Sequence, residues 1–166
     1  MRVFLGPNLS VTEMIQAALA DDSPLPPPTK PSPYTAADNI RNSADFVQVD
    51  PPNLLAAWRF AIMQTLDDYQ YSLRLSTEDA AQVFKEEPMR THPCIDAAIA
   101  GLAEYLANRD GWTAPTWSLD PTRVCSKDWY VAGIDNEWCR NLALTESPDE
   151  FRSRGVLTTM GGLTRV

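Results

Sequence analysis

Between residues 50 and 111 the apolar side chains recur at the three- and four-residue spacing of an α-helix, which constrains the fold more than any other feature of the chain. The longest such segment runs to about residue 74. Asp50 is placed to cap its N-terminus, and Pro51 and Pro52 fall in the first turn, where their missing N–H groups cost little. One face of this predicted helix carries Leu54, Leu55, Trp58, Ala61, Ile62, Thr65, Leu66 and Tyr69.

Two more helices are predicted in the same region. Residues 76–88 begin with Ser76 or Thr77 as the cap and end at Pro88, and residues 92–111 end at Gly111. Strand signals are few, so we predict an all-α or nearly all-α fold, a compact bundle of short and medium helices. The inward faces of these two helices carry Ala80, Val83, Phe84, Ile95, Ala98, Ile99, Leu102, Tyr105 and Leu106.

The first 22 residues predict one short amphipathic helix. Ser10 and Glu13 form a capping box at its start. A helix of about three turns is not stable alone in water, so we expect it to dock on the body of the protein or on another chain. Its apolar stripe consists of Val11, Met14, Ile15, Ala18 and Leu19.

A proline-rich stretch separates this helix from the rest of the chain. Six of the eleven residues in Ser23–Pro33 are proline, which excludes a helix and favours an extended, semi-rigid connector. Residues 34–49 have no sustained period, and we predict one short helical turn and an extended piece at Phe46–Val49. The expected organisation is an N-terminal helix (1–22), a connector with an irregular segment (23–49) and a helical domain (50–166).

After residue 111 the chain becomes rich in tryptophan, proline and turn-forming residues. We expect an irregular region with a short helix capped by Asp120 and a brief extended piece in "WYVAG", starting at Trp129. A helix capped by Asp135 follows, with Trp138 and Leu142 inward and Cys139 as a further inward candidate.

The stretch "SPDEFRSRG" predicts the last helix. Ser147 is its expected cap, Pro148 takes the first helical position, and Glu150 completes a capping box. Gly155 is the expected stop, and an extended segment is predicted at Val156–Thr159.

The charge and cysteine content narrow the function classes. A net charge of −8 with no basic stripe argues against a free-standing nucleic-acid binder, which needs Lys and Arg to neutralise phosphates. Three cysteines without a secretory signal favour a reducing cytoplasm over a disulfide framework. The apolar runs are too short for a signal peptide or a membrane span, so we expect a cytoplasmic protein without membrane contact.

No reactive constellation stands out in the sequence. His92, the one histidine, is two residues from Cys94, a spacing at which side chains diverge on most backbones. The cysteines lack metal-ligand spacing, and the adjacent Gly161 and Gly162 lack the Lys and Ser/Thr of a phosphate-binding loop. Acidic pairs such as Asp67–Asp68 resemble solvated helix ends, although the sequence does not exclude a catalytic site built from two carboxylates. We predict no catalytic, cofactor-binding or metal-binding residues.

The tryptophans and the late arginines are the candidates for recognition. We expect Trp58, Trp129 and Trp138 in the core, whereas Trp112 and Trp117 are placed either in the core or at a partner surface. For Arg152 and Arg154 two interpretations stay open. They offset local acids, or one of them pairs with the body or a partner through its bidentate guanidinium.

The segment order from residue 76 to 166 resembles a family of actinobacterial antitoxins and helix-turn-helix regulators whose genes neighbour those of nucleotidyltransferase-like toxins. The motifs are "APTW", an aromatic "WY", and "AL…SP..F..RGV". The resemblance implies a helical domain and a partner-binding role. The matching residues are Ala114, Pro115, Trp117, Trp129, Tyr130, Ala143, Leu144, Ser147, Pro148, Phe151, Arg154, Gly155 and Val156.

The resemblance does not extend to DNA binding. Many relatives carry an N-terminal helix-turn-helix, whereas residues 1–50 offer one capped helix and a connector. The leading hypothesis is therefore a non-enzymatic, antitoxin-like protein that binds and neutralises a cognate toxin. An operator-binding regulator, a carboxylate-based enzyme and a small helical phage or defence-locus structural protein are the alternatives. The expected partner-binding residues are Val11, Met14, Ile15, Leu19, Trp112, Trp117, Arg152 and Arg154.

Overall fold

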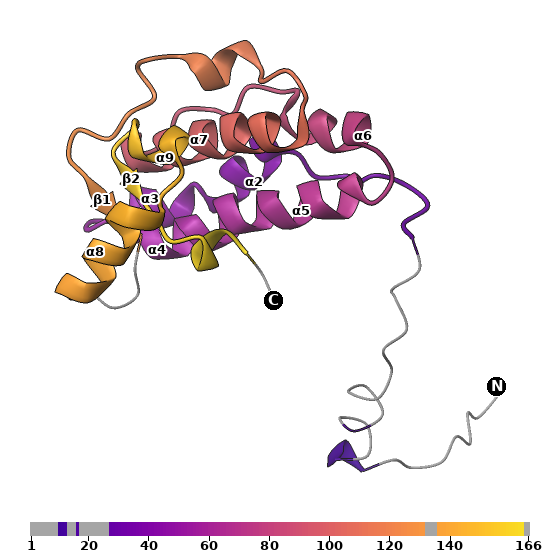
Figure 1. Ribbon diagram of the computed structural model, residues 1–166, viewed down its shortest axis with the longest axis horizontal. Coiled ribbons are helices and arrows are strands. Elements are labelled where there is room, and N and C mark those ends of the chain that lie inside the picture. The colour runs from indigo at the N-terminus through magenta and orange to yellow at the C-terminus, as the bar shows by residue number, and fades with distance from the viewer. Residues whose placement is uncertain (1–9, 13–15, 17–26, 132–135, 165–166) are drawn as a thin grey trace.

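The computed structural model describes residues 10–12, 16, 27–131 and 136–164 (Figure 1). Most of the described residues are helical, and two strands of two residues each form one small sheet. The prediction of a nearly all-α fold is therefore confirmed. In Figure 1 the two longest helical segments run side by side through the body, and the other elements cover them.

The first of these segments is a continuous run of three helical stretches. It comprises α4 (Leu54–Ala57), the π-helix η1 (Trp58–Met63) and α5 (Gln64–Leu73). The predicted helix is confirmed, but it begins later than expected. The Asn53 side chain accepts a hydrogen bond from the Ala56 N–H and caps the helix, so the two prolines and Asp50 precede it.

The second segment is α7 (Pro93–Asp110), which lies at the centre of the fold. His92 caps it through Nδ1, which accepts a hydrogen bond from the Cys94 N–H, and Gly111 ends it in the left-handed conformation with φ 75°. The predicted stripe is confirmed, yet burial extends around most of the helix because small residues fill its other faces. Its buried residues are Ile95, Asp96, Ala97, Ala98, Ile99, Ala100, Gly101, Leu102, Ala103, Leu106 and Ala107.

Along the chain, these two segments are separated by α6 (Thr77–Ala81) and the 3₁₀ turn η2 (Gln82–Phe84). The Ser76 hydroxyl accepts a hydrogen bond from the Asp79 N–H, as expected for one of the two predicted caps. Phe84 is fully buried, and Ala80 and Val83 are buried beside it.

The segment before residue 50 differs from the prediction. It forms α2 (Ala36–Ser43) and α3 (Asp45–Gln48), and the piece expected to be extended is helical. Thr35 and Asp38 form a capping box that starts α2. Ala36 and Ile40, one turn apart, are fully buried in the main core, so the core begins well before residue 50. α2 packs against η1, and this contact stabilises a helix of only eight residues.

The C-terminal part contains η3 (Thr116–Leu119), β1 (Trp129–Tyr130), α8 (Glu137–Glu146), α9 (Asp149–Arg152), β2 (Val156–Leu157) and η4 (Gly161–Leu163). The two strands pair in parallel, which confirms both predicted extended pieces. Asp120 does not start a helix. Its Oδ1 atom accepts hydrogen bonds from the N–H and hydroxyl of Thr122, and this local turn competes with a helix.

Two predictions about α8 are wrong. The side chain of Asn136, not Asp135, caps the helix by accepting a hydrogen bond from the Cys139 N–H. Trp138 is 70% exposed rather than inward. Ala143 is the only buried residue of this fully described helix, so its side of the helix packs toward the body. Trp138 lies five residues earlier, and a rotation of about 100° per residue places it on nearly the opposite side.

The capping box predicted for the last helix is also wrong. Ser147 ends α8, and its hydroxyl accepts from the Thr158 N–H and donates to the Thr158 carbonyl. The N-cap of α9 is Pro148, which has no capping side chain. Glu150 accepts a hydrogen bond from Asn108 on α7 instead of reaching back to a cap. The serine therefore satisfies the backbone after β2, a long-range partner that local sequence does not reveal.

Gly155 follows α9 in the left-handed region, with φ 73°. A Cβ added there would lie 3.3 Å from Cys125 Cβ, whereas one added at Gly111 would meet nothing within 4 Å. We therefore expect Gly111→Ala to lower the free energy of unfolding by about 1 kcal/mol, the cost of left-handed backbone alone. Gly155→Ala adds the steric contact, and we expect a loss of about 2–3 kcal/mol.

Urea denaturation followed by circular dichroism measures both losses. Equal losses in the two variants would contradict the close packing of Gly155 against the loop that carries Cys125.

Candidate functional site

Arg154, one of the predicted partner-binding residues, lies in the interior. Its Nη2 atom donates to Glu104 at 2.9 Å and to the Ser118 carbonyl at 2.6 Å, and its Nη1 atom donates to the Arg123 carbonyl at 3.2 Å. The guanidinium thereby joins α9, α7 and the loop after η3. Its side chain pairs with the body, so the interpretation in which Arg154 faces a partner is corrected.

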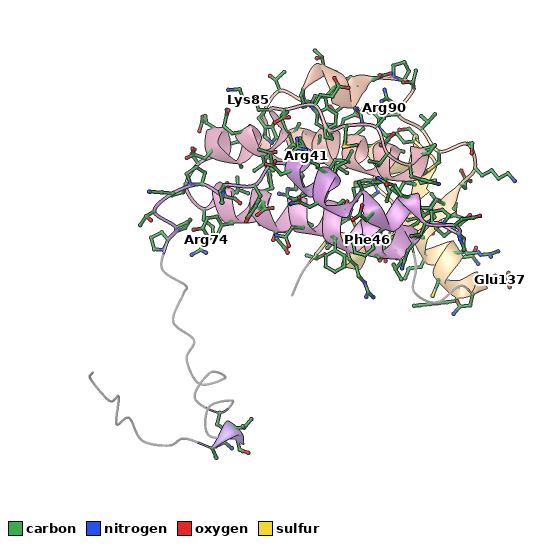
Figure 2. All side chains as sticks on the ribbon, turned by 180° about the vertical axis from the view of Figure 1, so that it is seen from behind. Arg41, Phe46, Arg74, Lys85, Arg90 and Glu137 are labelled. Carbon is green, nitrogen blue, oxygen red and sulfur yellow. The ribbon has the colours of Figure 1, made fainter. Side chains whose placement is uncertain are left out.

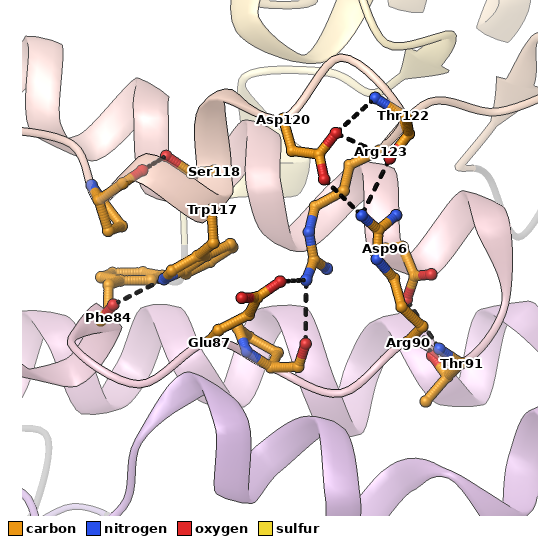
Figure 3. Close-up of polar contacts among 12 residues, drawn as sticks. Phe84, Glu87, Arg90, Thr91, Asp96, Trp117, Ser118, Asp120, Thr122 and Arg123 are labelled. Atoms are coloured by element: carbon orange, nitrogen blue, oxygen red, sulfur yellow. Dashed lines mark hydrogen bonds and ion pairs between the residues drawn. The ribbon is translucent and has the colours of Figure 1, made fainter.

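Arg123 forms the second half of this buried cluster (Figure 3). The residue is 0% exposed and stacks over the Trp117 ring, with its guanidinium carbon 5.2 Å from the ring centroid. Its Nη2 atom donates to Glu87 and to the Pro88 carbonyl. Trp117 is itself buried and donates from Nε1 to the Phe84 carbonyl at 3.1 Å. Of the two placements open for Trp117, the structure therefore supports the core.

Trp112 is half-buried at the edge of a polar and aromatic cluster. Its indole N–H donates to the Tyr69 hydroxyl at 2.9 Å, and that hydroxyl donates to Asp110 at 2.6 Å. Burial, together with the bond to Asp110, raises the pKa of the Tyr69 hydroxyl well above its usual value. The hydrogen-bonded guanidinium of Arg109 holds the pKa of Asp110 below its usual range. Trp112 thus ties the end of α7 to α5.

The remaining predicted residues have fewer contacts. Arg152 has a side chain that is 46% exposed and donates to the Ser147 carbonyl at 2.7 Å, with Asp149 3.3 Å away, so its partners are local. Val11 is 68% exposed, and Val11 and Thr12 are helical as expected. Met14, Ile15 and Leu19 lie outside the described residues.

A different group of side chains, most of them aromatic, lies over η1 and α5. Phe60 is 56% exposed although it lies on the long helical segment, and its ring stacks on that of Phe46 with the centroids 5.1 Å apart. Tyr34 and Tyr71 are also exposed. We define the aromatic surface as Tyr34, Phe46, Phe60, Gln64 and Tyr71.

The aromatic surface is hollowed in three adjoining places. The hollow on the α4 side measures 560 Å³ and is lined by Phe60 together with Leu55, Met63 and Val131. A second, of 470 Å³, lies between Phe60, Phe46 and Tyr34, and a third, of 690 Å³, lies between Tyr34 and Tyr71. Gln64 lines all three, so the hollows form one continuous surface.

A buried hydrogen-bond network holds one edge of this surface in place. Asp68 on α5 accepts from the Ser32 hydroxyl at 2.7 Å and from the Asn39 amide at 2.8 Å. The Ser32 N–H donates to Ser72 at 3.0 Å. These bonds fix the end of the proline-rich segment and α2 against α5, and they position Tyr34 at the rim of two hollows.

The backbone beneath the surface is itself unusual. A π-helical stretch is rare and is frequently found at functional sites. Here it turns Trp58 inward, where its ring meets Trp129 at 5.8 Å and Phe151 at 6.3 Å, while Arg59 and Phe60 point to solvent. Buried Trp58 anchors the helix that presents exposed Phe60.

The aromatic surface offers aromatic rings and the Gln64 amide for contact. Among the described residues, no group of three or more His, Cys, Asp or Glu side chains is placed to hold a metal ion. His92 serves as the cap of α7. Within the same described part of the chain, no helix combines the length and apolar character that crossing a lipid bilayer requires.

The sequence contained a partial signal for the aromatic surface. Phe60 falls outside the predicted apolar stripe of its helix, which indicates exposure. An exposed apolar residue by itself is ordinary. The neighbours that make it a surface, Phe46 and Tyr34, come from the segment that was predicted to be irregular.

The buried arginines lead to a stability prediction. We expect Arg154→Ala to lower the free energy of unfolding by about 3 kcal/mol, because it leaves buried carbonyl groups and Glu104 without their donor. The control is Arg152→Ala, which removes a partly exposed arginine of the same helical segment and costs less than about 1 kcal/mol. Urea denaturation measures both. A small loss of stability in Arg154→Ala would contradict the conclusion that the buried hydrogen bonds of Arg154 stabilise the fold.

Comparisons with known proteins do not place the chain in a family. No family model, no curated protein and no solved structure matches it. The aromatic surface and the motif resemblance of residues 76–166 are therefore the observations that bear on function.

Proposed function

We propose that this protein is a non-catalytic interaction protein, similar to the antitoxin component of a toxin–antitoxin pair, and that it binds its partner through the aromatic surface. The observation that carries the proposal is the exposed Phe60, stacked on Phe46 and lining two of the three adjoining hollows. The motif resemblance of residues 76–166 supports the antitoxin class.

The composition of the surface supports protein binding. Interface centres are enriched in aromatic residues and depleted of charged ones, and the central residues here are Tyr34, Phe46, Phe60 and Gln64. Aromatic side chains bury a large area while few rotatable bonds are immobilised. Phe60 lies on η1 and Gln64 begins α5, so both stand on one continuous helical segment whose backbone needs no ordering when a partner arrives.

The overall charge bears on the choice of partner. A net charge of −8 disfavours a nucleic-acid backbone and favours association with a basic protein surface. In the proposed role, the partner inserts apolar side chains into the hollows beside Phe60. This buries the partner's own groups and blocks its active cleft. The product of the neighbouring gene is the first candidate, because in the resembling family that gene encodes a nucleotidyltransferase-like toxin.

The proposal predicts that Phe60→Ala weakens partner binding by about 10- to 30-fold, the loss expected for a central aromatic contact. The fold should survive, because the side chain is mostly exposed. The measurement is co-expression with the neighbouring gene product, affinity purification through a tag on this chain, and titration calorimetry of the purified pair.

The matched control is Leu119→Ala. Leu119 is also a largely exposed apolar residue, but it precedes Asp120, which pairs with Arg90. Arg90 and Phe46 lie toward opposite edges of the body (Figure 2). We expect the control to bind within about twofold of the wild type, since peripheral contacts contribute little. Equal affinity of Phe60→Ala and wild type would reject this surface, and failure of the pair to associate would reject the proposed partner.

A further inference from the structure

The hollow between Tyr34 and Tyr71 differs in chemistry from the other two hollows of the aromatic surface. It measures 690 Å³, and Asp67 and Asp68 line it together with the two tyrosines, both of which are exposed. Of the described residues that line the other two hollows, none is acidic. We call this part of the surface the acidic hollow.

The acidic hollow is built from one helix face and a segment fixed against it. The α5 side follows three- and four-residue spacing and consists of Gln64, Asp67, Asp68 and Tyr71. Tyr34 belongs to the segment before α2, in which the Ser32 hydroxyl donates to Asp68 and the Ser32 N–H donates to Ser72. The walls are therefore in place before a ligand arrives, which lowers the entropic cost of binding.

Asp68 is a buried carboxylate, 7% exposed, whose donors are both neutral. Its Oδ1 atom accepts from the Ser32 hydroxyl at 2.7 Å and its Oδ2 atom from the Asn39 amide at 2.8 Å. Within the described part of the chain it forms no ion pair. Each carboxylate oxygen can accept a second hydrogen bond, so a cation in the adjacent hollow would offset part of the cost of burying this charge.

The charge balance of the lining also favours a cation. Lys30 is the one basic residue among the described lining residues, and it is exposed. Two carboxylates against one ammonium leave the lining net negative. The net charge of −8 on the whole chain adds a long-range attraction for positively charged groups.

We propose that the acidic hollow binds an arginine side chain of the protein partner. A guanidinium is planar, stacks on aromatic rings and directs several N–H groups toward carboxylates, so it matches both the tyrosines and the aspartates. This inference rests on the proposed function, because it names the side chain that the partner brings to this end of the aromatic surface.

The helix geometry also sets where that arginine lies in the partner. Phe60 and Asp68 are eight positions apart on one continuous helical segment, which corresponds to about 12 Å along its axis. The partner surface therefore presents an apolar group for the hollows beside Phe60 and an arginine at about this distance from it.

The test uses this chain alone, so that it does not depend on the identity of the partner. The probes are N-acetyl-L-arginine amide and N-acetyl-L-citrulline amide, in which a neutral urea replaces the guanidinium. Each probe is titrated into the isotope-labelled protein and followed by two-dimensional NMR of the amides. We expect saturable shifts at Asp67, Asp68 and Tyr71 with the arginine probe, and binding of the citrulline probe that is weaker by about fivefold.

Two variants locate the site. We expect Asp67→Asn to weaken binding of the arginine probe by about threefold, because it removes one charge at a partly exposed position. Tyr71→Leu should weaken it by a similar factor of about three, because it removes one aromatic face. Both side chains are at least partly exposed, so the fold should survive, and the amide spectra of the variants show whether it does.

The matched control is Glu137→Gln, which removes one negative charge from α8. Glu137 and Arg74, which follows α5, lie at opposite ends of the body (Figure 2). We expect this variant to bind the arginine probe as the wild type does. An equal loss in Glu137→Gln would show that the probe responds only to the overall charge, and would overturn the proposal.

Two further outcomes would overturn it. In one, the two probes bind with equal affinity. In the other, Asp67→Asn and Tyr71→Leu both keep the wild-type affinity. Failure of the co-expressed pair to associate is a separate result, because it rejects the proposed partner while the arginine probe still decides whether the hollow binds a guanidinium.

Discussion

The close packing around α7 is the constraint on which the rest of the structure depends. Small residues cover much of its surface, so neighbouring elements approach its backbone directly rather than through long side chains. Gly101 shows how tight this is, because a Cβ there would lie 3.1 Å from the Glu150 carbonyl and 3.3 Å from the Phe151 ring. Phe151 therefore fits only where a side chain is missing, and this contact sets how α9 crosses α7. The strand β2 follows shortly after α9 and packs beside it, and α8 in turn packs against β2.

In the C-terminal half, buried arginines donate hydrogen bonds to backbone carbonyl groups that in a regular helix would be bonded by backbone N–H groups. The chain between η3 and β1 has little secondary structure, so its carbonyl groups need donors from outside the segment. Arg154 supplies one to Arg123 in this segment and another to Ser118 in η3, and Arg123 supplies one to Pro88, in the segment that precedes α7. A guanidinium suits this task because its five N–H groups point in fixed directions. Among the described residues, Arg123 Nε and Nη1 have no hydrogen-bond partner, and the cation–π contact with Trp117 offsets part of their burial cost.

The parts of the fold that local sequence predicted are those whose cap, apolar stripe and stop lie in one continuous segment. α7 satisfies this condition, and its inward residues were predicted correctly. The cap and the inward residues of the preceding segment are also confirmed, but α6 ends at Ala81 and η2 at Phe84, before the predicted stop at Pro88. Where the decisive partner is distant, prediction failed. Ser147 has the spacing of a helix cap but bonds to Thr158. Arg154 has the position of a surface arginine but meets Glu104, fifty residues away in the sequence. Trp138 was predicted from its size to be inward, yet the burial of Ala143 fixes the helix rotation that exposes it.

The aromatic surface depends both on a helix that local sequence predicts and on residues that are distant in the sequence. The helix under Phe60 was predicted from its spacing, but the ring becomes part of an aromatic surface only because α3 brings Phe46 against it and the segment before α2 brings Tyr34 to the rim of the same hollow. The segment before α2 and α2 itself are held by Asp68, which receives hydrogen bonds from Ser32 and Asn39. A buried carboxylate with these two donors tolerates little displacement, since losing either donor leaves charge unsatisfied. The geometry of the surface is thus coupled to this polar network, and Asp68 itself lines the hollow between Tyr34 and Tyr71.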